Sequence, residues 1–240
     1  MIKFFRKIRQ QLLAKNKVSS YVLYAVGEIV LVVIGILIAL SINNWQQENQ
    51  NKKLEKRYLE DLRVNLKRDS TILQGIYVEA INSSEAKNYI TAHLRNRESN
   101  LDSLALSFGH QWNPYKIFSP STSTIDEMKS NGDLKIIRDE SIRKHIVDIY
   151  NTYELFLQDE NLYRESTREI FIMAKAGLNN ITDYSNEEIV VLLREPKLAN
   201  TIHRNFANGR VNSVENVINE CNQLLRILDE YSNELGIKSP

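Results

Sequence analysis

The longest uninterrupted apolar run of the chain lies near its N-terminus. Residues 21–42 read YVLYAVGEIVLVVIGILIALSI and contain one charged residue, Glu28. At about 1.5 Å per residue in a helix, this run can cross the roughly 30 Å hydrocarbon core of a bilayer. Aromatic residues flank it, with Tyr21 and Tyr24 at one end and Trp45 at the other, where amphipathic rings meet membrane interfaces. The pattern predicts a single transmembrane helix over residues 21–42.

Three long stretches after this run carry apolar residues at intervals of three and four, the spacing of one helix face. They extend from Gln46 to about Arg97, from Asp139 to about Lys175 and from Val211 to Leu235. The last stripe is the most regular and consists of Val214, Ile218, Cys221, Leu225 and Leu228, reinforced by Val217, Leu224 and Tyr231. No segment alternates as a β-strand would. We therefore predict an all-α chain in which the long helices form an antiparallel bundle.

Glycine, proline and capping residues divide the rest of the chain. Residues 98–120, which include two prolines, are predicted to form a loop with one short helical turn. The expected helix boundaries are Ser123 as an N-cap, Asn131-Gly132 as a C-terminal end, Ser185 with Glu188 as a capping box, and Pro196 as a first helical residue. Interruptions are predicted at Asn82-Ser83-Ser84 and at Asn208-Gly209.

Charge is distributed unevenly and sets the expected topology. Six cations precede the apolar run, at Lys3, Arg6, Lys7, Arg9, Lys15 and Lys17, and no acid precedes Glu28. The positive-inside rule places residues 1–20 in the cytoplasm and residues 43–240 outside it. Without those six cations and Glu28, the 31 basic and 30 acidic residues leave a net charge of −4. Nucleic acid is therefore not an expected partner, and the single cysteine, Cys221, excludes an intrachain disulfide in this sequence.

A cleaved signal peptide is the competing interpretation of the apolar run. Ala39-Leu40-Ser41 is a weak match to a cleavage site. The run is longer than the apolar core of a signal peptide, and it contains a carboxylate. These two properties favour an uncleaved anchor.

Four segments together resemble a known family. They read FFRKIRQQLL followed by YVLYAVGEIVLVVIGILIALSINNW, then KLEKRYLEDLRVNLKRD and TSTIDEMKSNGDLKII, and the long helix after them also matches. The chain resembles uncharacterised single-pass proteins of Bacteroidota that are grouped as a domain of unknown function. The resemblance implies an inner-membrane protein of the cell envelope with a periplasmic domain, and it implies no activity.

Glu28 is the most specific candidate site, because a carboxylate inside a membrane span is costly and often functional. Ala25, Glu28, Gly35 and Ala39 share one face of the predicted helix, and small residues on such a face allow close helix packing. We expect this face to contact a second copy or another membrane protein. Two alternatives stay open: Glu28 reaches the nearby cytoplasmic interface, or it carries protons as the acids of stator-type proteins do.

The remaining candidates are weaker. Trp112, Tyr115 and Phe118 could line a partner or ligand patch, or they could fold back onto the bundle. The four histidines and Cys221 lack metal-ligand spacing, and Cys221 lies on a core stripe. No phosphate loop, nucleophile elbow or zinc-protease motif occurs. We therefore predict a non-enzymatic protein without a metal or cofactor.

The leading hypothesis is a membrane-anchored envelope protein whose helical domain binds a protein partner or itself. A ligand-sensing bundle is the main alternative. With a short cytoplasmic tail, such a sensor would signal through a membrane partner. A proton-coupled subunit using Glu28 is the third hypothesis.

Overall fold

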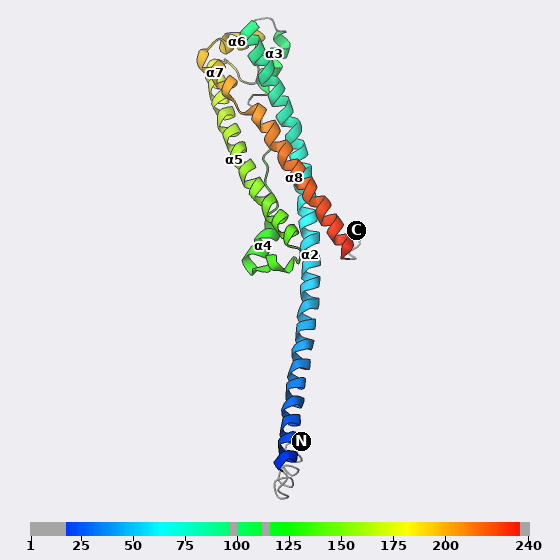
Figure 1. Cartoon of the computed structure of the whole chain (residues 1–240). Helices are drawn as coiled ribbons and strands as arrows, with labels where there is room; N and C mark the ends of the chain where they lie inside the picture. The colour runs from blue at the N-terminus through cyan, green and yellow to red at the C-terminus, as the bar shows by residue number, and fades with distance from the viewer. Residues whose placement is uncertain (1–17, 97–99, 112–115, 236–240) are drawn as a thin grey trace. The chain divides into compact units, whose positions relative to one another are not determined.

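A computed structural model describes residues 18–96, 100–111 and 116–235 of the chain (Figure 1). Within these ranges every regular element is helical, which confirms the predicted all-α class. The elements are α2 (Val18–Asn96), α3 (Leu101–Gly109), α4 (Ser123–Asn131), the 3₁₀ helix η1 (Asp133–Ile136), α5 (Glu140–Gly177), α6 (Asn186–Leu193), α7 (Pro196–Arg204) and α8 (Ala207–Glu234).

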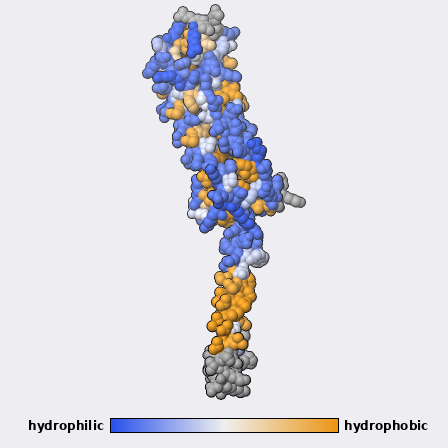
Figure 2. Space-filling view, viewed as in Figure 1, coloured by the Kyte–Doolittle hydropathy of each residue, from blue (hydrophilic) through white to orange (hydrophobic). Residues whose placement is uncertain are grey.

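The chain divides into two compact units, Met1–Leu54 and Glu55–Pro240. In the first unit, the large apolar side chains of α2 are exposed. Their exposed fractions run from 47% at Val33 to 76% at Leu23. Figure 2 shows the same segment as a band of hydrophobic surface. This helix has the length and composition to cross a membrane, and a signal sequence has the same properties.

The second unit is a bundle of α2 from Glu55 onward, α5 and α8. Along α2 the hydrogen-bonded residue numbers rise while those of their partners on α8 fall. The pairs are Glu55 with Tyr231, Ser70 with Asn222, and Ser84 with Asn208. Partners on α5 and α8 do the same: Tyr153 with Cys221, and Glu160 with Arg210. Helix α8 is therefore antiparallel to both neighbours, as predicted. It follows that α2 and α5 are parallel to each other. The predicted antiparallel bundle did not include a parallel pair.

A parallel pair of helices needs a connection that returns along the bundle. Residues 116–122, here called the strap, make this return. The strap and the start of α4 contact α2 in reverse order, through Lys116 with Glu79, Ser121 with Asp69, and Thr124 with Asn65. From Asn65 to Glu79, α2 rises about 21 Å along its axis. Residues 116–124 would cover only about 12 Å if all of them were helical. The strap must therefore be extended, and it has no regular secondary structure.

Short helices cover the end of the bundle where α2 stops, here called the far end. Helices α3, α6 and α7 gather there over a core that includes Ile90, Phe108 and Ile170. The Asn186 amide donates to Asp102 at 2.7 Å and links α6 to α3. A Cβ atom at Gly177 would collide with Leu192, so glycine permits the close approach of α5 and α6. Helix α3 spans nine residues, more than the single turn predicted in this region.

Most predicted helix boundaries are confirmed, and three differ. Gly132 ends α4 in the left-handed conformation at φ 70°, Ser185 and Glu188 form a complete capping box, and Pro196 is the first residue of α7. Helix α2 continues through Asn82-Ser83-Ser84, and α8 already includes Asn208-Gly209, because the chain breaks at Asn205 instead. Thr122, not Ser123, stands at the N-cap of α4, where it makes no side-chain capping bond.

The buried face of α8 is shifted slightly from the predicted stripe. Val214, Val217, Cys221, Leu224 and Leu228 are at most 2% exposed. Ile218 and Leu225 are only partly buried and lie at the edge of the core. Two of the reinforcing positions, Val217 and Leu224, are thus more central than two of the main positions of the predicted stripe.

We predict that Leu224→Asp unfolds the bundle, because it places a carboxylate at a position without a hydrogen-bonding partner in the core. Replacing a buried leucine in this way costs several kcal/mol, which is a large share of the stability of a domain. Circular dichroism and urea unfolding of the fragment from Gln46 to Pro240 measure the effect. Leu155→Asp on α5 is the matched control, since Leu155 is 64% exposed. A folded Leu224→Asp fragment would contradict the assignment of this face.

Candidate functional site

The four residues of the predicted small face lie on the apolar part of α2. Ala25 and Glu28 are partly exposed, while Gly35 and Ala39 are exposed. Apart from the adjacent backbone of α2 itself, no atom of the described residues lies within 4 Å of the position that a Cβ on Gly35 would occupy. The backbone at Gly35 is therefore open to the close approach of another helix. Helical spacing places the four residues on one side, and their role in packing stays a prediction.

Of the three residues in the predicted aromatic patch, only Phe118 lies in the described part of the chain. Trp112 and Tyr115 lie outside the described residues. Phe118, on the strap, is 2% exposed and packs edge-to-face on Tyr153 and Phe156, with ring centroids 5.0 and 5.7 Å apart. Phe118 therefore folds back onto the bundle and serves as a core residue between the strap and α5.

A buried carboxylate fixes the strap to the middle of α2. Asp69 is fully buried and accepts the Ser121 backbone N–H at 3.1 Å on each oxygen and the Ser121 hydroxyl at 3.0 Å. The Tyr150 hydroxyl donates to the Ser121 carbonyl at 3.2 Å, which adds α5 to the same network. Burial raises the pKa of Asp69, and the hydrogen bonds from Ser121 oppose this rise without cancelling it. The network joins three segments of the bundle by polar contacts.

A buried ion pair joins α5 and α8 nearer the far end. Arg210 is fully buried, and its Nε and Nη2 atoms donate to the two oxygens of Glu160 at 2.6 and 3.0 Å. Its guanidinium lies 4.5 Å from the centre of the Tyr163 ring. Such a bidentate pair has strict geometry, and breaking it would leave a buried charge. This arrangement fixes the register of α8 against α5.

The single cysteine is a core residue. Cys221 is buried, lies 3.5 Å from the Tyr153 hydroxyl and donates to the Leu66 carbonyl at 3.3 Å. Burial raises the pKa of the Cys221 thiol, which makes the reactive thiolate harder to form. Across the residues with described positions, no group of three His, Cys, Asp or Glu side chains gathers as a metal site.

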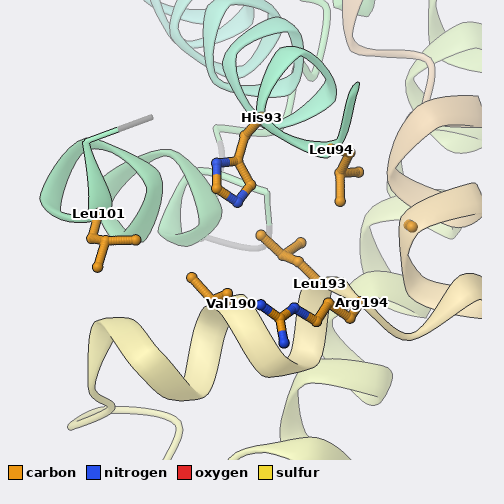
Figure 3. A pocket seen from close by; sticks show the side chains of 7 residues that line it. His93, Leu94, Leu101, Val190, Leu193 and Arg194 are labelled. Carbon is orange, nitrogen blue, oxygen red and sulfur yellow. The ribbon is translucent and has the colours of Figure 1, made fainter. Parts of the chain in front are cut away.

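A cleft of about 610 Å³ opens at the far end. It lies between the end of α2, α3, α6 and α7, and its apolar lining comes from Leu94, Leu101, Val190, Leu193 and Ala199. Two basic residues also line it, His93 from α2 and Arg194 from the end of α6 (Figure 3). Its volume lies within the range typical of small-molecule sites. A second hollow of about 540 Å³ lies beside Leu106, Phe171 and Tyr184.

Neither basic residue of the cleft stands out in the sequence as a ligand-binding residue. In the sequence, His93 shows no metal-ligand spacing, and Arg194 lies at the end of a short helix. The cleft forms between two pairs of consecutive elements, α2 with α3 and α6 with α7, that are far apart in the sequence, so no local motif encodes it. Basic residues near helix C-termini, at His93 and Arg194, were the one available signal.

The fold and these sites define an all-α protein with one exposed apolar helix and a bundle whose segments are joined by buried polar contacts. The chain belongs to a family of unknown function, DUF6090, whose model matches residues 28–208. The match begins at Glu28 and extends into the start of α8, so it includes the return of the strap and the short far-end helices. Comparisons with curated proteins and with solved structures find no match.

We predict that Asp69 makes stability depend on pH. Because its pKa is raised in the folded state, the folded chain binds a proton more readily than the unfolded chain, whose aspartates titrate near about 3.9. This contribution to the free energy of unfolding is present below about pH 4 and is lost as the pH rises through the folded pKa. Asn at this position stays neutral and keeps an acceptor for Ser121. Wild type should therefore lose stability relative to Asp69→Asn between pH 4 and 7.

Urea unfolding of the fragment from Gln46 at several pH values measures this difference. Asp61→Asn is the control, because Asp61 is an exposed aspartate of the same helix. If the stability difference between wild type and Asp69→Asn stays constant across this pH range, the pKa of Asp69 is not raised by burial.

Proposed function

We propose that this protein is a membrane-anchored scaffold of the bacterial cell envelope. In this proposal the apolar part of α2 crosses the inner membrane, with residues 1–20 in the cytoplasm and the bundle in the periplasm. The bundle binds a protein partner or a second copy, and no catalytic step is assigned to it. The observation that carries the proposal is the apolar part of α2, whose large apolar side chains are exposed and which has the length and composition to cross a membrane.

Two further properties support an anchor over a cleaved signal sequence. The helical conformation continues through Ala39-Leu40-Ser41 and onward to Asn96. The apolar run inside this helix is longer than the apolar core of a signal peptide, which favours an uncleaved anchor. The six cations before the span favour the cytoplasmic side for the N-terminus.

The face of Ala25, Glu28, Gly35 and Ala39 is the proposed contact within the membrane. Its small residues allow two helix backbones to approach closely, and the Glu28 carboxyl can hydrogen-bond across the contact. This contact would bring together two copies, or this chain and another inner-membrane protein. The surrounding bilayer is the other partner of the helix.

A ligand-sensing bundle is the second candidate function. The far-end cleft favours it, because the cleft combines an apolar lining with two basic side chains. A sensor of this kind would pass its signal to a membrane partner through the helix contact described above.

The topology prediction concerns where the two ends of the chain lie. A reporter enzyme that is active only outside the cytoplasm should be active when fused after Pro240 and silent when fused before Met1. The fusion protein should also keep its full length in the membrane fraction, because the span is not removed. The reverse pattern of activity would exclude the proposed orientation, and a shortened membrane-free product would establish a cleaved signal.

The contact prediction compares Glu28→Gln, Glu28→Leu and Gly35→Leu with wild type by crosslinking in native membranes. Gly35→Leu should reduce crosslinking most, since it separates the backbones. Glu28→Leu should reduce it partially, because interhelical hydrogen bonds in membranes contribute about 1–2 kcal/mol at best. Glu28→Gln keeps the hydrogen bonding and should resemble wild type.

The same series separates the alternatives. If Gln at position 28 is as damaging as Leu, ionisation of the carboxyl matters and proton transfer by Glu28 becomes the better hypothesis. If all variants crosslink like wild type, the small face makes no specific contact. Ile36→Leu is a suitable control, because it changes the shape of an exposed apolar residue of the same helix without adding volume.

A further inference from the structure

Hydrogen bonds and apolar contacts hold together the helices that form the walls of the far-end cleft. Asn100 caps the start of α3 by accepting the backbone N–H groups of Asp102 and Ser103. The Asn186–Asp102 hydrogen bond then holds α6 against α3. Leu193, only 1% exposed, anchors α6 in the far-end core and supplies the floor of the cleft. The cleft is thus bounded by helices that polar and apolar contacts both fix.

The two polar side chains that line the cleft among the described residues are both basic. Figure 3 shows the His93 ring extending from α2 toward α6, with the Arg194 side chain lying beneath it on the opposite wall. No carboxylate is among the residues that line the cleft in the described part of the chain. The positive charge of Arg194 would attract an anion and repel a cation.

His93 also has an unused hydrogen-bonding atom. Its Nδ1 is buried and has no hydrogen-bond partner among the described residues. A buried polar atom without a partner costs free energy. A turn of the ring about its χ2 bond would bring Nδ1 to the cleft, where pairing with a bound group would recover this cost. With its proton on Nδ1, the ring would donate to an acceptor oxygen, and the Arg194 guanidinium supplies further donors for a planar carboxylate.

We propose that this cleft binds a small amphipathic carboxylate. The carboxylate would lie between His93 and Arg194, and its apolar body would cover Leu94, Val190 and Leu193. The inference goes beyond the scaffold function proposed above, because binding here can be measured whether or not the membrane helices associate. The same chemistry fits an aromatic acid or a short acyl chain with a free carboxylate, and the experiment distinguishes these two sources.

The test uses the full-length chain in lipid nanodiscs and two probes, 3-phenylpropionate and octanoate. Isothermal titration, corrected with empty nanodiscs, measures binding, and 3-phenylpropan-1-ol provides the matched neutral ligand. At least one acid should bind, and the tighter one identifies the aromatic or acyl source. The alcohol should bind about tenfold more weakly than 3-phenylpropionate, as loss of a charge-assisted hydrogen bond predicts.

The variants locate the site. Arg194→Gln should weaken binding of the acid about tenfold and leave the alcohol unaffected, while His93→Gln should weaken the acid less. Arg226→Gln is the matched control, since Arg226 is an exposed arginine on α8. Ala199→Leu, which reduces the cleft volume without changing charge, should weaken the acids and the alcohol alike.

Circular dichroism checks that each variant is folded. In addition, the imidazole signal of His93, assigned by its loss in His93→Gln, should shift when the acid is added to wild type. Absence of binding by both acids would overturn the proposal. Equal binding of acid and alcohol, or unchanged binding in Arg194→Gln, would overturn it as well.

Discussion

The parallel direction of α2 and α5 is the constraint on which the rest of the bundle depends. Two parallel helices cannot be joined by a short turn, so the chain must return along the whole bundle before α5 begins. The strap makes this return in an extended conformation, and Asp69 fixes it to the middle of α2 by binding the Ser121 backbone and hydroxyl. Phe118 then fills the space between the strap and α5.

Buried polar groups, more than apolar packing, specify how the segments align. Apolar helix faces tolerate sliding by a turn, because leucine and isoleucine contacts are not directional. The Arg210–Glu160 pair accepts only one register of α8 against α5. The Asp69–Ser121 contact likewise fixes the register of the strap against α2. These groups cost free energy when desolvated, and in exchange they exclude alternative alignments.

The two candidate sites differ in kind and lie in separate units of the chain. The helix face with Glu28 is suited to a partner inside a bilayer, where small residues and a carboxyl group are useful. The far-end cleft is suited to a small anion, since it places two basic side chains above an apolar floor. Together they are compatible with a protein that is anchored by one unit and binds with the other.

The sequence by itself determined the all-α class, most of the helix boundaries and the apolar helix. These depend on local periodicity and on capping residues such as Gly132, Ser185 and Pro196, whose effects act within a few residues. It also predicted the small face with Glu28, because helical spacing is enough to define one face. Only the tertiary structure decided that α2 and α5 are parallel, that Phe118 is buried, and that Leu224 is more central than Leu225. The cleft at His93 and Arg194 was equally hidden, because it forms from four elements whose contacts depend on long-range packing and leave no periodic pattern in the sequence.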